Sequence, residues 1–215
     1  MVDSGEEVSA GKIRNTNRYV LGAEVLKNGC NPVYLGCAGD SVEEIKRLIE
    51  KGLENCDALL LTGGVSVGDY DLTPEAMKQA GIHILVRGVG MKPGMACAYG
   101  EKEGKTVFGL SGNPASALTG FYAVVMPVLR KLAGRKDYIP QEITVKLTED
   151  FPKKSRCTRL LHGRLDISDG IAKIRISKKQ GNVVISSAIG CDVLVIVPAG
   201  SGPLNAGTEL KGFLL

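Results

Sequence analysis

Apolar positions follow a helical pattern and then a strand-like pattern in the first third of the chain. In "RYVLGAEVLKNG" they recur every three to four positions, residues 15–17 can cap the start of a helix, and the Asn-Gly pair at 28–29 ends it. A second helical stripe, "VEEIKRLIEKGLEN", follows Ser41, which forms a capping box with Glu44. "PVYLG" before this helix and the continuously apolar "DALLLTGG" after it predict two strands. This alternation is typical of βαβ units with a parallel sheet.

The alternation of helix and strand patterns continues as far as the middle of the chain. A Thr-Pro-Glu sequence at 73–75 predicts a helix start with Thr73 as its N-cap. "IHILVRGV" predicts a strand, and "MACAYG" and "KTVFGL" predict a hairpin around the charged turn "EKEGK". Asn113 and Pro114 repeat the helix-start signal before the long apolar helix "ASALTGFYAVVMPVLRKLAG", for which we predict a kink at Pro127.

The pattern changes after residue 140. Short β-type runs ("ITVKL", "RLLHGRLDI", "IAKIRIS", "NVVIS", "DVLVIVP", "TELKGFLL") are separated by glycine-containing turns and show no helical period. These runs predict a small all-β domain, a barrel or a sandwich. The expected fold is therefore an α/β domain over residues 1–140, built as a doubly wound and mostly parallel sheet, followed by a β-barrel domain over residues 141–215.

Composition narrows the class of protein. Of the 215 residues 44% are hydrophobic and 23% charged, and no apolar run approaches the roughly 18 residues that span a bilayer. Residues 1–20 contain no apolar signal-peptide segment, so we expect a cytoplasmic protein without a membrane partner. Six cysteines without a CxxC pair are expected to be reduced. Few aromatic residues and no nucleic-acid-binding motif argue against a nucleic-acid partner. Much of the net charge of +4 comes from Lys153, Lys154, Arg156, Arg159 and Arg164, a group usually found on a solvated face.

Three loops follow predicted strands of the α/β domain: "TGGVSVGDYD" at 62–71, "KPG" at 92–94 and "LSGNPAS" at 110–116. Ligands bind outside the carboxyl ends of the strands in such sheets, so we expect the loops to converge on one crevice. The glycines of the first loop allow main-chain N–H groups to face phosphate, and the helix start after Asn113 also favours an anion. The spacing matches neither GxGxxG nor a P-loop, and a glycine turn alone serves equally well as strand-to-helix geometry.

Asp69 and Asp71 stand where phosphate is expected, although carboxylates repel phosphate. A Mg²⁺ ion between carboxylate and phosphate would remove the conflict, and amine donors of a ring such as a pterin would use the carboxylates as acceptors. The alternative is purely structural, with Asp69 in an Asx turn and Asp71 favouring the dipole of the next helix. The residues alone favour the structural role for Asp69 and leave both interpretations open for Asp71.

Taken together, the loops resemble those of the molybdopterin molybdotransferases, the MoeA and gephyrin E-domain family of molybdenum cofactor biosynthesis. "TGGVSVGDYD", "KPGMACAYG" and "GLSGNPASAL" carry the resemblance in this order. "GKIRNTNRYVLGAEVLKNG" resembles the helix after the family's Ser-Thr-Gly-Asp-Glu segment, and "GNVVISSAIGCDVLVIVPAG" resembles its C-terminal barrel. The resemblance implies that molybdate is inserted into adenylylated molybdopterin, with release of AMP and with the help of a divalent metal such as Mg²⁺.

The resemblance and the loop positions together give a set of expected site residues. Asp71, Glu6 and Asp40 are the expected catalytic carboxylates, and Asp71 and Glu6 would hold the metal. Ser111 stands where the family usually has proline, which would relax that loop. The expected pterin- and phosphate-binding residues are Gly63, Gly64, Val65, Ser66, Gly68, Asp69, Lys92, Pro93, Gly94, Ser111, Gly112, Asn113, Pro114 and Ser116.

Two departures from the family leave the function open. The family's N-terminal pair of domains, about half of its polypeptide, has no counterpart here, and Glu6 replaces the usual aspartate. Most of the strand that the family has before this position is also missing, which would leave a sheet edge unpaired. We therefore expect a fragment or a reduced relative. It would be a molybdotransferase, a molybdopterin-binding module without turnover, or an assembly module that forms homodimers, with a molybdopterin adenylyltransferase as a further candidate partner.

Overall fold

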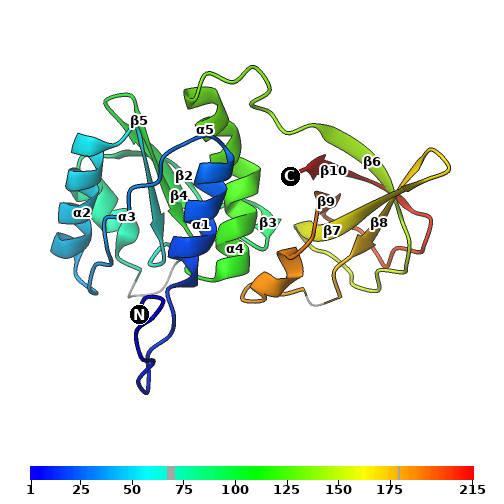
Figure 1. The fold of residues 1–215 in the computed structure, drawn as a ribbon, viewed down its shortest axis with the longest axis horizontal. Helices are drawn as coiled ribbons and strands as arrows, with labels where there is room; N and C mark the ends of the chain where they lie inside the picture. The colour runs from blue at the N-terminus through cyan, green and yellow to red at the C-terminus, as the bar shows by residue number, and fades with distance from the viewer. Residues whose placement is uncertain (67–70, 179) are drawn as a thin grey trace.

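A computed structural model describes residues 1–66, 71–178 and 180–215. An α/β part contains the N-terminal half of the chain and a β part contains the C-terminal end (Figure 1). The elements are α1 (Thr16–Lys27), α2 (Val42–Asn55), β1 (Ala58–Thr62), α3 (Thr73–Gln79), β2 (His83–Arg87), β3 (Met91–Lys92), β4 (Ala98–Lys102), β5 (Lys105–Leu110), α4 (Pro114–Gly120), a π-helical turn (Phe121–Val125), α5 (Met126–Leu132), β6 (Glu142–Leu147), β7 (Thr158–Ser168), β8 (Ile171–Ile176), a 3₁₀ turn (Ile185–Ala188), β9 (Val193–Val197) and β10 (Glu209–Leu214).

The α/β part contains a four-stranded sheet in the order β1-β5-β4-β2. β1 and β5 are parallel, whereas β4 is antiparallel to both β5 and β2. The predicted hairpin is confirmed as β4 and β5, and it places one antiparallel strand among three that run in the same direction. The sheet is therefore mixed, and β1 and β5 are its one parallel pair among the described residues. The expected α/β class is confirmed.

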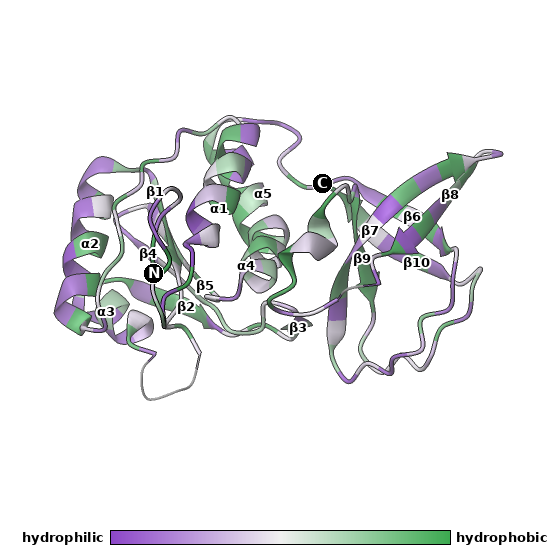
Figure 2. Ribbon diagram, turned by 60° about the horizontal axis from the view of Figure 1, so that its bottom comes forward, coloured by the Kyte–Doolittle hydropathy of each residue, from purple (hydrophilic) through white to green (hydrophobic). Residues whose placement is uncertain are grey.

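Helices cover both faces of this sheet (Figures 1 and 2). On one face, Ile49 of α2 and Met77 of α3 pack in a core that includes Val107 of β5. On the other face, the next residue of β5, Phe108, packs with Phe121 in a core that also contains residues of α1 and α5. Successive strand residues point to opposite faces, so the near-continuous apolar sequence of β5 serves both cores. Burial of each such side chain stabilises the fold by about 1.5–3 kcal/mol.

The predicted strand "PVYLG" is absent, because residues 31–39 form no strand. Within the described residues, β1 pairs with β5 on one side and has no strand on the other. The segment packs through its side chains instead: Leu35 and Leu59 both lie against α2, where a Cβ added to Gly52 would meet them at 2.9 and 2.6 Å. A segment becomes a strand only beside a hydrogen-bonding neighbour, and the described residues provide none for this one.

The long apolar helix changes its hydrogen-bond pattern ahead of Pro127. Residues Phe121–Val125 form a π-helical turn, in which the N–H of Met126 donates to the carbonyl oxygen of Phe121 five positions earlier. Proline has no N–H and crowds the preceding turn, so a widened turn accommodates it. The structure has this π-helical turn directly before Pro127, and the kink expected there stays a prediction.

The β part is a closed barrel. Strands β7, β8, β6, β10 and β9 are paired in that order, and β7 also pairs with β9, which closes the ring. Val145, Leu161, Ile174 and Val195 belong to its core. The prediction of a strand at "NVVIS" is wrong, because Ile185–Ala188 form a 3₁₀ turn. A closed barrel offers no free edge to a further strand, so this apolar segment packs outside the ring.

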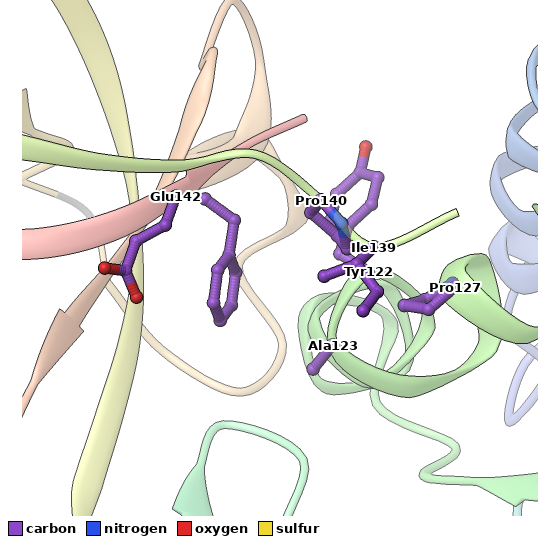
Figure 3. A pocket seen from close by; sticks show the side chains of 7 residues that line it. Tyr122, Ala123, Pro127, Ile139, Pro140 and Glu142 are labelled. Atoms are coloured by element: carbon purple, nitrogen blue, oxygen red, sulfur yellow. The ribbon is translucent and has the colours of Figure 1, made fainter. Parts of the chain in front are cut away.

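The two parts share a core and a strand pairing. Leu160 and Leu194 of the barrel belong to the same hydrophobic cluster as Phe121 and Tyr122. β3, a short strand of the α/β part, runs parallel to the start of β7. An apolar pocket of about 260 Å³ (Figure 3) lies between the two parts and is lined by Tyr122, Ala123, Pro127, Ile139, Pro140, Glu142 and Phe213. In the described part of the chain, no helix is long and apolar enough to cross a membrane.

Candidate functional site

The loops after β1 and β5 leave the same edge of the sheet and touch through their main chains. The two strands stay paired to their last residues, Thr62 and Leu110, and the N–H of Gly63 donates to the carbonyl oxygen of Leu110 at 2.9 Å. A Cβ added to Gly112 would lie 3.3 Å from the Cα of Gly63. The two loops therefore form a wall of main chain on which a ligand could lie close to N–H groups.

Thr73 holds the first loop in place. Its N–H donates to the carbonyl oxygen of Gly64 at 3.0 Å, and its hydroxyl donates to that of Gly63 at 2.9 Å. The prediction of Thr73 as N-cap is wrong, since Leu72 is the N-cap of α3 and Thr73 is its first residue. Gly64 has a φ of +62°, and a Cβ there would meet the Thr73 hydroxyl at 2.7 Å. Both features require glycine at this position.

Three other predicted residues belong to this loop, namely Val65, Ser66 and Asp71. Val65 is buried, and its side chain lies where a Cβ on Gly109 of β5 would meet it at 2.9 Å. Ser66 is exposed and Asp71 is half-buried. The predicted residues Gly68 and Asp69 lie outside the described residues.

The Lys-Pro-Gly turn reaches the loop after β5 by way of α4. Gly94 has a φ of +100°, and a Cβ there would lie 3.2 Å from the carbonyl oxygen of Ser116. The bond between Lys92 and Pro93 is cis. Lys92 is exposed and pairs in register with Arg159 of the barrel, so two cationic side chains start from neighbouring strands here. The turn is thus in contact with the third loop, and no described contact joins it directly to the first.

The start of α4 is partly occupied by the barrel. Asn113 is the N-cap without a side-chain cap bond, and Pro114 follows it. The N–H of Ser116 donates to the carbonyl oxygen of Asn182 at 3.2 Å, and its hydroxyl approaches the same oxygen at 3.5 Å. Ser111 contributes its hydroxyl oxygen, which accepts from the N–H of Asn113 at 3.3 Å. The N–H of Ser116 is therefore already used, which reduces what this helix start can offer an anion.

Asn17, at the start of α1, is a site neighbour that the sequence analysis treated only as a cap. Its side-chain Nδ2 donates to the carbonyl oxygen of Gly112 at 3.0 Å. The true cap is Asn15, whose side-chain oxygen accepts from the N–H of Arg18 at 3.2 Å. A helix start needs only one capping side chain, so the presence of asparagine at both 15 and 17 was the sequence signal that one of them has another role.

Arg18 and Tyr34 form a charged and aromatic cluster near the start of α1. The Arg18 guanidinium pairs with the Asp3 carboxylate and lies 3.9 Å from the centre of the Tyr34 ring. Burial, together with a hydrogen bond to the Cys37 thiol, raises the pKa of Tyr34 to about 12. The Tyr34 hydroxyl therefore stays protonated at neutral pH and can donate or accept hydrogen bonds.

The two other predicted carboxylates lie on exposed segments. Glu6 accepts the N–H of Asp3 through its carboxylate at 2.8 Å, within a turn of the N-terminal segment. Asp40 is exposed directly before Ser41, the N-cap of α2. Within the described residues, no three His, Cys, Asp or Glu side chains are grouped closely enough to hold a metal ion. A Mg²⁺ ion that takes most of its ligands from phosphate and water needs only one carboxylate from the protein, and Asp71 is the one of the three predicted carboxylates that belongs to the glycine loop.

Comparison with known proteins gives the family. Residues 1–131 match the family described as "Probable molybdopterin binding domain", and residues 144–215 match "MoeA C-terminal region (domain IV)". Proteins named molybdopterin molybdenumtransferase are similar over 96% of this chain: the one from Staphylococcus aureus strain Mu50 is 32% identical over 209 residues, and the one from Staphylococcus epidermidis strain RP62A is 33% identical over 208.

Solved structures agree with these matches. A molybdopterin biosynthesis MoeA protein from Pyrococcus horikoshii superposes with a TM-score of 0.81 at 28% identity, over 99% of this chain and 51% of its own. A molybdenum cofactor biosynthesis protein from Pyrococcus furiosus gives a TM-score of 0.71 at 28% identity, over 93% and 64%. The chain spans about half the length of the curated relatives that it matches, 49% in both cases above. It belongs to the MoeA family, with a molybdopterin-binding domain followed by the MoeA C-terminal region.

Proposed function

We propose that this chain binds molybdopterin, in its adenylylated form, across the Gly63–Gly112 wall and takes part in the insertion of molybdate with release of AMP. The observation that carries the proposal is the contact between the two glycine loops, where a Cβ on Gly112 would approach the Gly63 Cα to 3.3 Å. Glycines at such a contact let a ligand approach the main chain closely, and main-chain N–H groups are the donors that commonly bind phosphate. Relatives named molybdopterin molybdenumtransferase support the reaction, and their greater length makes it a proposal for this chain.

The residues of the proposed site would have different roles according to their charge. Gly64 and Ser66 would offer N–H and hydroxyl donors to phosphate, and Gly63, whose N–H already donates to Leu110, would let the ligand approach the main chain closely. Lys92 would add a positive charge from the side of the barrel. Asp71 would hold a Mg²⁺ ion against the same phosphate oxygens. The ion would neutralise negative charge on the phosphate from which AMP leaves. Glu6 and Asp40 stay candidates for a supporting carboxylate role, with Glu6 already engaged by Asp3.

AMP release tests this proposal directly. The chain is mixed with adenylylated molybdopterin, molybdate and Mg²⁺, and AMP is measured against a sample without protein. Asp71→Asn should reduce AMP release at least about tenfold, because it removes one charge next to the transferred group. The matched control is Asp57→Asn, at the opposite end of β1, where the carboxylate is exposed. Equal release by the wild type, Asp71→Asn and Asp57→Asn would contradict the assignment of Asp71.

A binding module without turnover is the second candidate. This function requires only the ligand contacts of the Gly63–Gly112 wall and no catalytic carboxylate. Saturable binding of molybdopterin without AMP release would select this function. No binding of molybdopterin at all would refute both candidates.

An assembly role as a homodimer is also proposed from the sequence, with a molybdopterin adenylyltransferase as a candidate partner and the cytoplasm as the expected location. Light scattering of the purified chain measures the oligomeric state, and a mass of about 23 kDa, that of one chain, would contradict the homodimer. Co-elution with an adenylyltransferase would test the second partner. Neither outcome alters the test of AMP release.

A further inference from the structure

Asn17 has an unpaired polar atom next to the wall formed by the two glycine loops. The residue is only 8% exposed, and its Nδ2 donates to the carbonyl oxygen of Gly112 at 3.0 Å. This bond fixes the orientation of the amide, because the opposite orientation would place two oxygens against each other. The remaining atom, Oδ1, is buried and has no hydrogen-bond partner among the described residues.

The other buried asparagines of this region use their side chains fully. Asn15 accepts from the N–H of Arg18 and donates to the hydroxyl of Tyr34. Asn28 accepts from Nε of Arg130 at 2.7 Å and donates to the carbonyl oxygen of Glu24 at 2.8 Å. Buried amide oxygens without a partner are rare, since each gives up its bonds to water without replacement. Asn17 is therefore an exception, and it stands beside the proposed ligand.

The chemistry of the unpaired atom selects the part of the ligand that it would meet. Oδ1 is an acceptor and needs an N–H or O–H donor. Phosphate oxygens at neutral pH are acceptors as well, so they cannot satisfy it. A pterin ring has N–H groups both in the ring and on its exocyclic amine, whereas adenine has only an exocyclic amine. A nitrogen heterocycle is thus the matching chemical class, and the pterin offers more donors.

We propose that Oδ1 of Asn17 accepts a hydrogen bond from an N–H group of the bound pterin ring and so contributes to ligand specificity. The inference rests on the proposed function, because it assumes that molybdopterin lies on the Gly63–Gly112 wall. Asn17 has two roles in this arrangement. Its Nδ2 holds the loop at Gly112 in place, and its Oδ1 accepts the hydrogen bond that distinguishes the pterin ring.

The test is a titration of the full chain with molybdopterin and, separately, with AMP. Asn17→Ala should weaken molybdopterin binding by about three- to tenfold more than AMP binding, because the lost Oδ1 bond concerns the pterin alone, whereas the lost Nδ2 bond to Gly112 would affect both ligands equally. The matched control is Asn28→Ala, which removes a buried asparagine with both groups paired. It should lower the unfolding temperature and leave both dissociation constants unchanged. If Asn17→Ala does not fold, Asn17→Ser removes Oδ1 and keeps a hydroxyl that can donate to Gly112.

The outcomes separate the inference from the function on which it rests. Wild-type chain that fails to bind molybdopterin would overturn the proposed function and the inference with it. Wild-type binding with an equal dissociation constant for the Asn17 variant would overturn the inference alone. A loss that appears with AMP and not with molybdopterin would also overturn it, because adenine would then be the donor. A selective loss for molybdopterin would support it.

Discussion

His162 should make the stability of this protein depend on pH between 4 and 6.5. The residue is 1% exposed and lies at the junction of the barrel with the α/β part. Its ring packs edge to face against that of Tyr122, with the ring centres 6.3 Å apart. Nε2 has no hydrogen-bond partner in the described part of the chain. Burial lowers the pKa of His162 from 6.5 to about 4, because the charged ring would lose its hydration.

The direction and size of the effect follow from this pKa. In the unfolded chain His162 has an ordinary pKa near 6.5, so below that pH the unfolded state binds a proton that the folded state refuses. The contribution to stability is complete above pH 6.5 and is lost as the pH falls towards 4. At 1.36 kcal/mol for each pKa unit, the full difference is about 3 kcal/mol, and about 2 kcal/mol of it should appear between pH 7 and pH 5.

Urea unfolding at pH 7 and pH 5 measures this loss. His162→Leu should reduce the difference between the two pH values by about 2 kcal/mol, because the titrating group is gone. His83→Leu is the matched control, since His83 is the chain's only other histidine and lies exposed at the start of β2. A pH dependence that is unchanged in His162→Leu, or reduced equally in His83→Leu, would refute the reasoning.

Three further predictions concern the site and its supports. Gly112→Ala should weaken molybdopterin binding about tenfold, because its Cβ displaces the Gly63 main chain; Gly22→Ala, which meets no atom within 4 Å, should leave binding unchanged. Thr73→Val should cost about 1–3 kcal/mol in urea unfolding by leaving the Gly63 carbonyl oxygen unpaired, whereas Thr73→Ser should cost less, and equal losses would contradict this role. Ser41→Ala should cost about 1 kcal/mol by removing the cap of α2, with molybdopterin binding unaffected in the same titration.

Much of the fold was predictable because local signals and tertiary packing agree. The capping pair Ser41 and Glu44 marks the start of α2, and the hairpin sequence gives β4 and β5. The failures occur where an apolar run lacks a strand partner. "PVYLG" has no described neighbour at the β1 edge, and "NVVIS" meets a closed barrel. Whether a strand forms depends on a second segment, so neither outcome can be predicted from the run itself.

For the candidate site, the positions of the loops were predictable, but the side chains that hold them were not. Loop positions could be inferred from strand order, because loops at the carboxyl ends of parallel strands share one edge. The contact between Gly63 and Gly112 is of this kind. The roles of Thr73 and Asn17 were not predictable, since each bonds to a loop carbonyl that is positioned only in the folded chain. From the sequence alone, a polar residue next to a helix start is interpreted as a cap, even when its side chain donates to a distant carbonyl oxygen in the folded chain.

The barrel is part of the site's support and not a separate attachment. The carbonyl oxygen of its Asn182 accepts a hydrogen bond from the N–H of Ser116 at the start of α4, and its strand β7 pairs with β3, which contains Lys92. Both contacts bear on loops that would hold the ligand. His162 lies in the same junction, against Tyr122 of the π-helical turn. If the ligand lies on the Gly63–Gly112 wall as proposed, the position of the barrel affects which N–H donors of α4 and which cations of β3 and β7 are available to it. A charged side chain introduced into this junction should therefore weaken ligand binding as well as stability.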